Sequence, residues 1–305
     1  MPVKLRSIEI RLPDPGSATA FLAGVWGLTE VIRSAESVYL RGSGRAAYII
    51  GLHRSTNRSV KSLTFQYEEE EAAVLRQRIA ESGRPCRAVE SADPGGGVGF
   101  EVTLPEGEIF RFLAGCNSLE PMDNSDMPRQ LTHVVFNSAN AEASAGFVER
   151  FLGFRVSDRT KGMIFVRCNR THHSIAFARA GYSSLNHIAF EMADVDAVMR
   201  GIGRMRDAGF SPVWGPGRHG PGNNVFAYFI APFGGVIEFS TPTNEVPDNY
   251  PAGNPEDWVW PANRIDQWGV SDKNVTAISR AEKRFRFQSE SELRPEHQIS
   301  RGDRE

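Results

Sequence analysis

Residues 131–136 read Leu-Thr-His-Val-Val-Phe, and residues 185–190 repeat this pattern as Leu-Asn-His-Ile-Ala-Phe. A third short apolar stretch, Gly-Val-Ile-Glu-Phe at residues 235–239, carries a glutamate in place of a histidine. The first half of the chain has matching stretches, in which the positions of His133, His187 and Glu238 are taken by Ser7, Ser62 and Arg111. The offsets 133−7=126, 187−62=125 and 238−111=127 are nearly constant, which indicates an internal duplication.

The duplication predicts an α+β protein in which each half contains two strand-helix-strand-strand-strand units. Gly27 and Gly153, again 126 apart, are expected to end the first helix of each half in a left-handed conformation. Ser138 is the expected cap of the second-half helix. Short β-branched stretches predict strands, for example at residues 46–50, 163–166, 226–230 and 236–239. A later helix over residues 195–208 is expected to bury one face, formed by Val195, Val198, Met199, Ile202 and Met205.

A polar segment with two prolines, residues 119–129, separates the halves and predicts a boundary there. We therefore expect one domain over residues 1–120, a second over 129–243 and a tail over 244–305. The tail carries Trp258, Trp260 and Trp268, and side chains of this size are expected to pack on the body or on a neighbouring subunit. About the last twenty residues are rich in Glu, Arg and Ser, and poor order is expected there.

Composition narrows the class of protein. A chain of 305 residues with 40% apolar content has room for about two globular domains. The net charge of −2 provides no basic surface for nucleic acid, and neither a signal segment nor a membrane-spanning apolar run is present in the sequence, so a cytoplasmic protein is expected. The three cysteines, Cys86, Cys116 and Cys168, lie far apart, and free, mostly buried thiols are expected.

Two imidazoles and one carboxylate are the donor set of a catalytic metal site. Such a set leaves about half of an octahedral shell open, as in non-haem Fe(II) enzymes, whereas a structural zinc site needs a fourth protein ligand. A single histidine on an apolar strand is more often a hydrogen-bonded core residue, and a glutamate can lie exposed on an edge strand. The occurrence of all three donors at duplicated positions in one half favours His133, His187 and Glu238 as ligands of one ion.

These residues resemble the vicinal oxygen chelate superfamily and, within it, the type I extradiol ring-cleavage dioxygenases of the catechol 2,3-dioxygenase and dihydroxybiphenyl dioxygenase kind. The resemblance spans about residues 4–242, and its most specific part is His172-His173, then His187, Gly217-Arg218-His219, Tyr228 and Glu238. It implies two tandem glyoxalase/bleomycin-resistance-like domains, each a pair of βαβββ modules forming a curved, partly closed mixed sheet around a central cleft. It also implies metal ligands at His133, His187 and Glu238, an acid-base histidine at His173, and neighbouring catalytic residues at His219 and Tyr228.

The implied reaction is the insertion of both atoms of O2 into a catechol-type ring beside its two hydroxyls, in aromatic catabolism. Fe(II) is the expected metal, Mn(II) is an alternative, and O2 is a co-substrate. A homo-oligomer without nucleic-acid or membrane partners is expected. The competing hypotheses are a bleomycin-resistance-like binding protein without a redox metal, a 4-hydroxyphenylpyruvate-type dioxygenase and a glyoxalase-like isomerase.

Three finer expectations accompany the resemblance. Adjacent strand residues point to opposite faces, so His172 is expected to be exposed or structural if His173 reaches the site. Pro221 and Gly222 stand where relatives have polar residues, and Asn223 and Asn224 are candidates to compensate. Trp258, Trp260 and Phe226 are expected to line or cap an aromatic slot near the metal.

Overall fold

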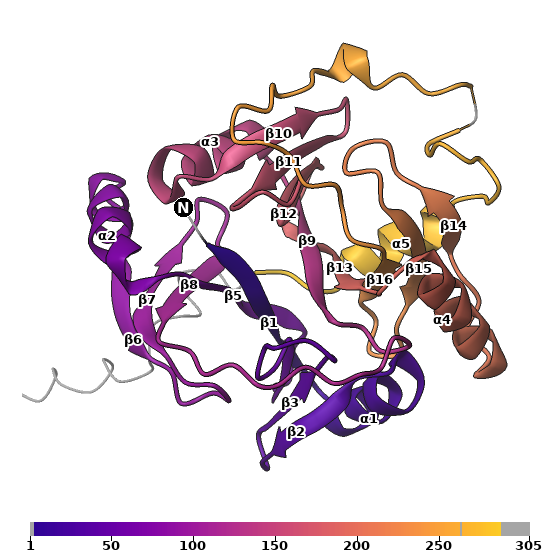
Figure 1. The fold of residues 1–305 in the computed structure, drawn as a ribbon, viewed down its shortest axis with the longest axis horizontal. Helices are drawn as coiled ribbons and strands as arrows, with labels where there is room; N and C mark the ends of the chain where they lie inside the picture. Colours follow the sequence, from indigo (N-terminus) through magenta and orange to yellow (C-terminus); the bar gives the residue numbers. More distant parts are fainter. Residues whose placement is uncertain (1–2, 263, 288–305) are drawn as a thin grey trace, which may run out of the picture.

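Two eight-stranded mixed sheets, one from each half of the chain, form the frame of the protein (Figure 1). The computed structural model describes residues 3–262 and 264–287. The first sheet has the order β2-β3-β4-β1-β5-β8-β7-β6, and the second has the same order with every strand number raised by eight. The equivalent orders confirm the duplication and the predicted α+β fold of paired βαβββ modules.

The strands of the first sheet are β1 (Lys4–Leu12), β2 (Thr29–Arg33), β3 (Ser37–Arg41), β4 (Ile50–Arg54), β5 (Ser59–Gln66), β6 (Cys86–Glu90), β7 (Val98–Thr103) and β8 (Ile109–Ala114). Those of the second are β9 (Gln130–Ser138), β10 (Arg155–Arg159), β11 (Met163–Arg167), β12 (Ile175–Arg179), β13 (Ser184–Glu191), β14 (Trp214–Arg218), β15 (Val225–Ile230) and β16 (Val236–Ser240). The helices are α1 (Pro15–Phe21) with the π-helical turn η1 (Leu22–Trp26), the 3-10 turn η2 (Glu69–Glu71) with α2 (Ala72–Glu81), α3 (Ala141–Leu152), α4 (Val195–Asp207), η3 (Pro255–Asp257) and α5 (Val275–Glu282).

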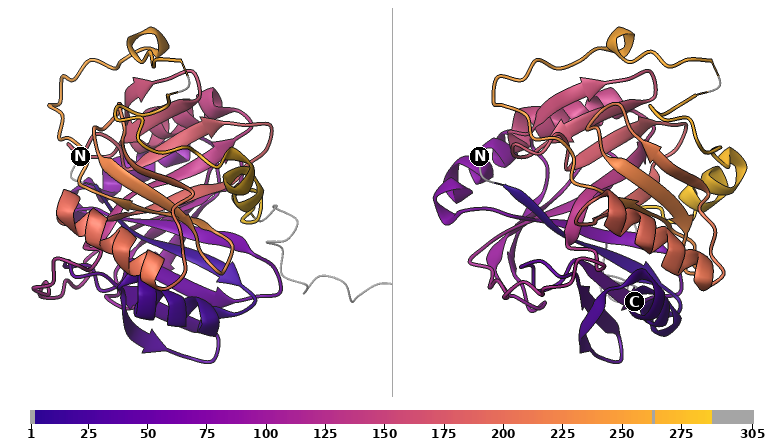
Figure 2. Two further views of the ribbon diagram at one scale, coloured as in Figure 1. Left: turned by 90° about the vertical axis from the view of Figure 1, so that its right-hand side faces the viewer. Right: turned by 45° about the vertical axis from the view of Figure 1, so that its right-hand side comes forward.

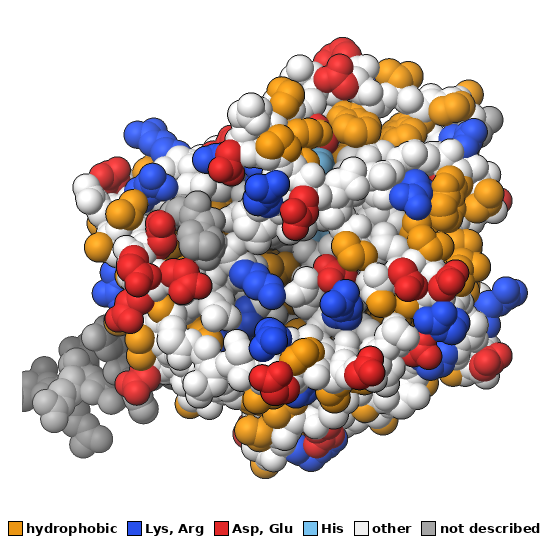
Figure 3. All heavy atoms as spheres, in the orientation of Figure 1, with side chains coloured by type: hydrophobic (Ala, Val, Ile, Leu, Met, Phe, Trp, Pro, Cys, Tyr) orange, Lys and Arg blue, Asp and Glu red, His pale blue; other side chains and the backbone are white. Residues whose placement is uncertain are grey.

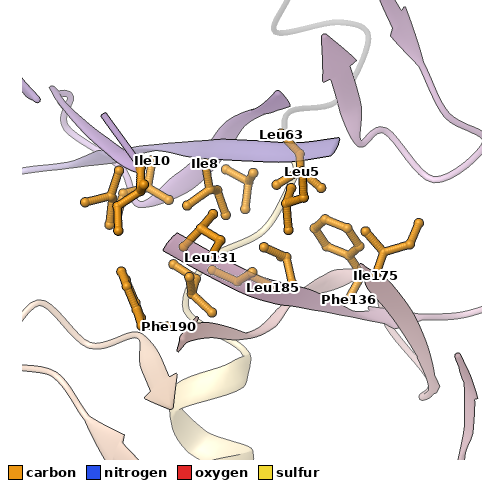
Figure 4. Packing of buried hydrophobic residues seen from close by; sticks show 14 of the residues in the cluster. Leu5, Ile8, Ile10, Leu63, Leu131, Phe136, Ile175, Leu185 and Phe190 are labelled. Carbon is orange, nitrogen blue, oxygen red and sulfur yellow. The ribbon is translucent and has the colours of Figure 1, made fainter. Parts of the chain in front are cut away.

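The two sheets share one apolar core. Leu5, Ile8 and Leu63 of the first sheet face Leu131 and Leu185 of the second across their interface (Figure 4). Because the core is continuous between the halves and residues 119–129 form neither helix nor strand, the division into separate domains at that segment stays a prediction.

Strand alternation decides what the other face of the second sheet carries. On β9, Val134 and Phe136 belong to the shared core, so His133, Val135 and Asn137 point to the opposite, concave side. Alternate residues of residues 131–136 thus belong to the shared core and to the site.

Several local predictions need correction. The cap of α3 is Asn140, whose side chain accepts a hydrogen bond from Ala143 N, because β9 continues as far as Ser138. Residues 46–49 are not a strand; Ala47, Tyr48 and Ile49 are buried in a connection, and β4 begins at Ile50. Gly153 does end α3 with φ 70°, as predicted.

Helix α4 buries a narrower face than expected. Val198, Ile202 and Met205 are buried, whereas Val195 and Met199 are exposed, because Ala197 and Gly201 complete the buried stripe instead. The cysteines are free, but only Cys168 is buried, and the expectation of a buried thiol is wrong for Cys86, which is exposed.

The tail crosses the second sheet. It passes over β10 and β11, returns along β14 and leads into α5, which lies against β13 and β16 (Figure 2). Trp258 and Trp260 pack against Gly220, and Arg218 lies over the ring of Trp268, so this part of the tail does pack on the body. The expectation of poor order concerns residues beyond 287, outside the described range. None of the described helices has the length and apolar character needed to cross a bilayer.

Candidate metal centre

His133, His187 and Glu238 come together on three neighbouring strands. In the register of β9, β13 and β16, Ala189 pairs with both His133 and Glu238, and His187 is two residues from Ala189 on the same face. One donor atom from each of the three side chains lies within 4.8 Å of the others, and all three residues are buried. The sequence offsets therefore correspond to one spatial cluster, and it is the only such cluster found among the described residues.

The donor atoms fit a divalent cation. Glu238 Oε2 lies 3.1 Å from His187 Nε2 and 3.3 Å from His133 Nε2, yet it has no hydrogen bond of acceptable geometry. A buried carboxylate oxygen without a partner is costly unless it coordinates a metal. Nitrogen and carboxylate oxygen donors suit Fe, Mn and Zn, so the residues present match the implied ion.

Asparagines hold the ligands from behind. His187 Nδ1 donates to Asn186 Oδ1 at 2.7 Å, and Asn186 Nδ2 donates to Asn137 Oδ1 at 2.7 Å. This bond keeps the proton on Nδ1 and leaves the Nε2 lone pair free for a metal. Asn224 donates to Glu238 Oε1 at 3.3 Å and to Ser240 Oγ at 2.8 Å.

Burial and the neighbouring charges together set the protonation states around the triad. Burial lowers the pKa of His187, although the nearby charge of Glu238 acts in the opposite direction, and burial also lowers the pKa of His219 to about 3. Burial alone would raise the pKa of Glu238, but the imidazoles of His133 and His187 outweigh it and hold that pKa below its usual value. Neutral imidazoles and an ionised carboxylate are the forms that bind metals.

His219 and Tyr228 lie beside the triad. His219 Nε2 is 3.1 Å from the Tyr228 hydroxyl and 3.8 Å from Glu238 Oε1, and the hydroxyl is 3.5 Å from His187 Nε2. The ring of Phe226 stacks on that of His219 at 3.9 Å. Phe226 is fully buried and supports His219 from behind, so the prediction that it lines the slot is wrong.

His172 and His173 are both buried. They lie in a short connection between β11 and β12, where strand alternation does not apply. The expected outcome still holds, because His173 lines the cavity whereas His172 does not and instead pairs with Asp158 as a structural residue. Their Nδ1 atoms are 2.9 Å apart, and the His173 ring lies 4.4 Å from that of His133. His173 thus reaches the site, with His172 directly behind it.

Gly222 has a steric role. Its φ is +81°, and a Cβ at this position would lie 2.9 Å from Cε1 of His173. Gly222 thus stands where relatives have a polar residue because the backbone at this position approaches the His173 ring closely. Of the two candidate substitutes, Asn224 reaches Glu238, whereas Asn223 accepts a hydrogen bond from Gln267 of the tail.

A cavity of about 440 Å³ opens from the triad. Its walls include Val135, Met163 and Phe165 from the second sheet and Trp260 and Ile278 from the tail. The prediction of a tail tryptophan at the slot therefore holds for Trp260, while Trp258 packs on Gly220 behind it. The sequence analysis did not predict helix α5, which supplies Ile278, because this helix lies outside the duplicated pattern. It also gave no role to Asn186, although Asn186 directly precedes His187.

The first sheet contains no comparable donor set. At the position of Glu238 it has Arg111, whose Nη1 lies 2.5 Å from Glu9 Oε1 and 2.8 Å from Asp93 Oδ2. Lys61 and His53 also contact Glu9, at 2.7 and 2.9 Å. Ion pairs within the protein occupy the interior of this half.

Comparisons with known proteins agree with this site. The profile of the Glyoxalase/Bleomycin resistance protein/Dioxygenase superfamily matches residues 130–239. Metapyrocatechase 2 of Cupriavidus necator is 27% identical over 291 residues, covering 85% of this chain and 87% of that protein. The structure of homoprotocatechuate 2,3-dioxygenase from Arthrobacter globiformis shares the fold, with a TM-score of 0.78, 21% identity and 88% of each chain covered.

A higher identity is found with the structure described as the Mn(II)-bound glyoxalase from Novosphingobium aromaticivorans. It is 30% identical, has a TM-score of 0.82, and the match covers 90% of this chain and 93% of that one. The duplicated fold, the single buried triad and these matches lead to one conclusion: the chain belongs to the Glyoxalase/Bleomycin resistance protein/Dioxygenase superfamily.

Proposed function

We propose that this protein is an extradiol dioxygenase, which uses O2 to open a catechol-type ring beside its paired hydroxyls in aromatic catabolism. The observation that carries the proposal is a buried two-histidine, one-carboxylate triad at the base of a cavity that also presents His173, His219 and Tyr228. The likeness to Metapyrocatechase 2 over most of both chains supports the same reaction class.

Fe(II) is the proposed metal, held by His133, His187 and Glu238, with Mn(II) as the alternative. When bound, the ion would supply the Lewis-acid and redox chemistry that lets a catechol react with O2. The donor set suits both metals, and the description of the related glyoxalase structure as Mn(II)-bound keeps Mn(II) in the proposal.

The remaining residues act on the substrate and its protons. His173, beside the cavity, accepts a proton from a catechol hydroxyl and returns it later. The Tyr228 phenol stays protonated, because burial and the charge of Glu238 raise its pKa well above the usual value, and it donates a hydrogen bond toward the substrate oxygens together with His219. Trp260 and Ile278 of the tail cover part of the cavity and limit the access of water.

The cavity allows more than one catechol. About 150 Å³ is enough for a benzene-sized guest, so a cavity of about 440 Å³ leaves room for a substituent or a second ring. Which catechol is used is a question for a substrate panel.

Three other functions make different predictions. A bleomycin-resistance-like binding protein needs no redox metal, and the convergence of one donor atom from each of three buried side chains argues against it. A glyoxalase-like isomerase recruits ligands from paired modules, whereas Ser7, Ser62 and Arg111 offer no comparable set. A 4-hydroxyphenylpyruvate-type dioxygenase is disfavoured by the grouping of His173, His219 and Tyr228 around the cavity.

The test is anaerobic loading with Fe(II) or Mn(II), followed by catechols with one ring, with alkyl substituents and with two rings. Oxygen uptake with formation of a yellow product is expected. His133→Ala, His187→Ala and Glu238→Ala should each abolish metal retention and turnover, whereas His173→Ala should retain metal and lose rate. A protein that retains no metal, or that consumes no oxygen with any catechol, would refute the proposal.

Cytoplasmic location and a homo-oligomeric state belong to the same proposal. Acidic and basic side chains alternate on the face seen in Figure 3, which supports the absence of a nucleic-acid partner. Cell fractionation and light scattering of the purified protein test location and oligomeric state.

A further inference from the structure

A buried carboxylate lies behind the two adjacent histidines. Asp158 of β10 is 1% exposed, and its two oxygens have different partners: Oδ2 is 2.6 Å from His172 Nε2, and Oδ1 accepts from the backbone N–H of Gly253 at 2.8 Å. The resemblance and the proposed function assign no role to Asp158 or His172. Both are nevertheless connected to His173 through the 2.9 Å contact between the Nδ1 atoms of the two rings.

These contacts permit one arrangement of protons when both rings are neutral. A carboxylate only accepts hydrogen bonds, so the proton of His172 is on Nε2 and its Nδ1 is bare. Two ring nitrogens are hydrogen-bonded only if one of them carries hydrogen, so Nδ1 of His173 carries it. A neutral imidazole has a single ring proton, and Nε2 of His173 is therefore bare.

The ring of His173 has little freedom to rearrange. It packs edge-on against Phe165 at 5.1 Å, lies 4.4 Å from the ring of His133 and has the backbone of Gly222 against Cε1. His173 lines the cavity, and among the described residues no hydrogen bond involves its Nε2. The bare nitrogen is thus the one left for a molecule bound in the cavity.

We propose that Asp158 and His172 are positioning residues, which hold His173 in the tautomer with hydrogen on Nδ1 and so keep its Nε2 as a proton acceptor in the cavity. The proposal rests on the proposed function for the task of His173, but the tautomer itself is a property of the protein without substrate. Without this chain of hydrogen bonds, the other tautomer would present an N–H to the catechol and would be unable to accept its proton.

The decisive variant is Asp158→Asn. Its amide oxygen can keep the bond from Gly253, which turns the amide N–H₂ toward His172 and reverses both hydrogen bonds. The expected tautomer of His173 in this variant has hydrogen on Nε2. His172→Gln retains an acceptor for His173 Nδ1 and should preserve more activity than His172→Leu.

Long-range ¹H–¹⁵N spectra of the full-length protein, loaded with diamagnetic Zn(II) and labelled in histidine, report the tautomer directly. The signals of His173 are assigned by their loss in His173→Gln. We expect the wild type to show a bare Nε2 and Asp158→Asn to show a protonated Nε2. A protonated Nε2 in the wild type, or an unchanged tautomer in Asp158→Asn, overturns the proposal.

Kinetics provide the second measurement. In Asp158→Asn and His172→Leu, kcat should fall roughly 10²–10⁴-fold, the range for a general base, with KM and retained metal nearly unchanged. A fall in metal content or a rise in KM with constant kcat would instead indicate a merely structural role and would overturn the proposal. If no catechol is turned over, the proposed function fails, and the spectra alone decide the tautomer.

His53→Gln is the matched control. His53 also pairs with a buried carboxylate, with Nε2 2.9 Å from Glu9 Oε2, but it lies in the first sheet. Its loss is expected to lower stability and to leave both the His173 spectrum and kcat unchanged. An equal change in kcat for His53→Gln would show that loss of any such pair is enough, and would overturn the assignment to Asp158 and His172.

Discussion

Replacing Asn186 by leucine tests whether the hydrogen bond behind a metal ligand sets the affinity of the site. Leucine has nearly the shape of asparagine, but it removes the acceptor that lies 2.7 Å from His187 Nδ1. His187 is 4% exposed, so water has little access to replace that acceptor. Its Nδ1–H then either remains unpaired or moves to Nε2, where it blocks coordination.

The expected magnitude follows from the burial of that N–H. Leaving a buried donor unsatisfied costs about 1–3 kcal/mol, and loss of an outer hydrogen bond to a metal-bound histidine lowers metal affinity by about 10–100-fold. The two ranges agree, since a tenfold change in affinity is about 1.4 kcal/mol. We therefore expect Asn186→Leu to bind Fe(II) or Mn(II) about 10–100-fold more weakly.

The assay is anaerobic competition between the metal-free protein and a fluorescent chelator, with thermal unfolding of the metal-free protein as a check on the fold. Asn117→Leu, an exposed substitution in the first half, is the control and should bind metal like the wild type. An Asn186→Leu protein that folds normally and keeps the wild-type metal affinity would refute the reasoning.

Three further changes have defined outcomes. Glu108 is buried without a hydrogen-bond partner for either oxygen, and burial raises its pKa from 4.5 to about 8. The contribution of Glu108 to stability is therefore present below about pH 4.5 and is lost as the pH rises to about 8. Urea unfolding should show that Glu108→Gln gains about 3 kcal/mol relative to the wild type between about pH 4.5 and pH 7, whereas the exposed Glu36→Gln gains nothing; parallel pH curves would contradict this. Glu9→Gln removes the buried carboxylate that Arg111, Lys61 and His53 share, so Asp93 alone is left to balance this positive charge. The substitution should cost about 3–5 kcal/mol of stability with unchanged metal affinity, and a loss below about 1 kcal/mol would argue against it. Trp260→Ala enlarges the cavity and should raise KM for catechols while metal content stays constant, and an unchanged KM would remove Trp260 from the substrate wall.

Sequence reasoning found the triad because two simple periodicities apply there. Residues two apart on a strand share a face, and the pairing register places particular residues of neighbouring strands side by side. His133, His187 and Glu238 all lie on such strands, so constant offsets between the halves were enough to group them. The predicted helix over residues 195–208 agrees with α4, which spans Val195–Asp207.

The errors lie where the periodicity ends. His172 and His173 lie outside a strand, so the rule of opposite faces does not apply to them, although His172 does lie behind His173 as a structural residue. Residues 46–49 are apolar because a connection is buried, which local composition does not distinguish from a strand. Helix α5 lies outside the duplicated pattern, and nothing in the sequence tied Ile278 to the cavity on the second sheet.

The duplication also explains why only one half offers the proposed metal site. Arg111 occupies the position of Glu238, and Glu9 on β1 corresponds to Val135 on β9, so in the first sheet the cation belongs to the protein and the carboxylate comes from the neighbouring strand. Arg111 and Glu9 are both buried, and their charges satisfy each other together with Asp93 and Lys61. In the second sheet, when both imidazoles are neutral, the carboxylate of Glu238 is the only charge in the triad, and the proposed metal ion would balance it. On this proposal each sheet places positive charge in its interior, from a side chain in the first and from a bound ion in the second, and only the ion would offer positions that a substrate can share.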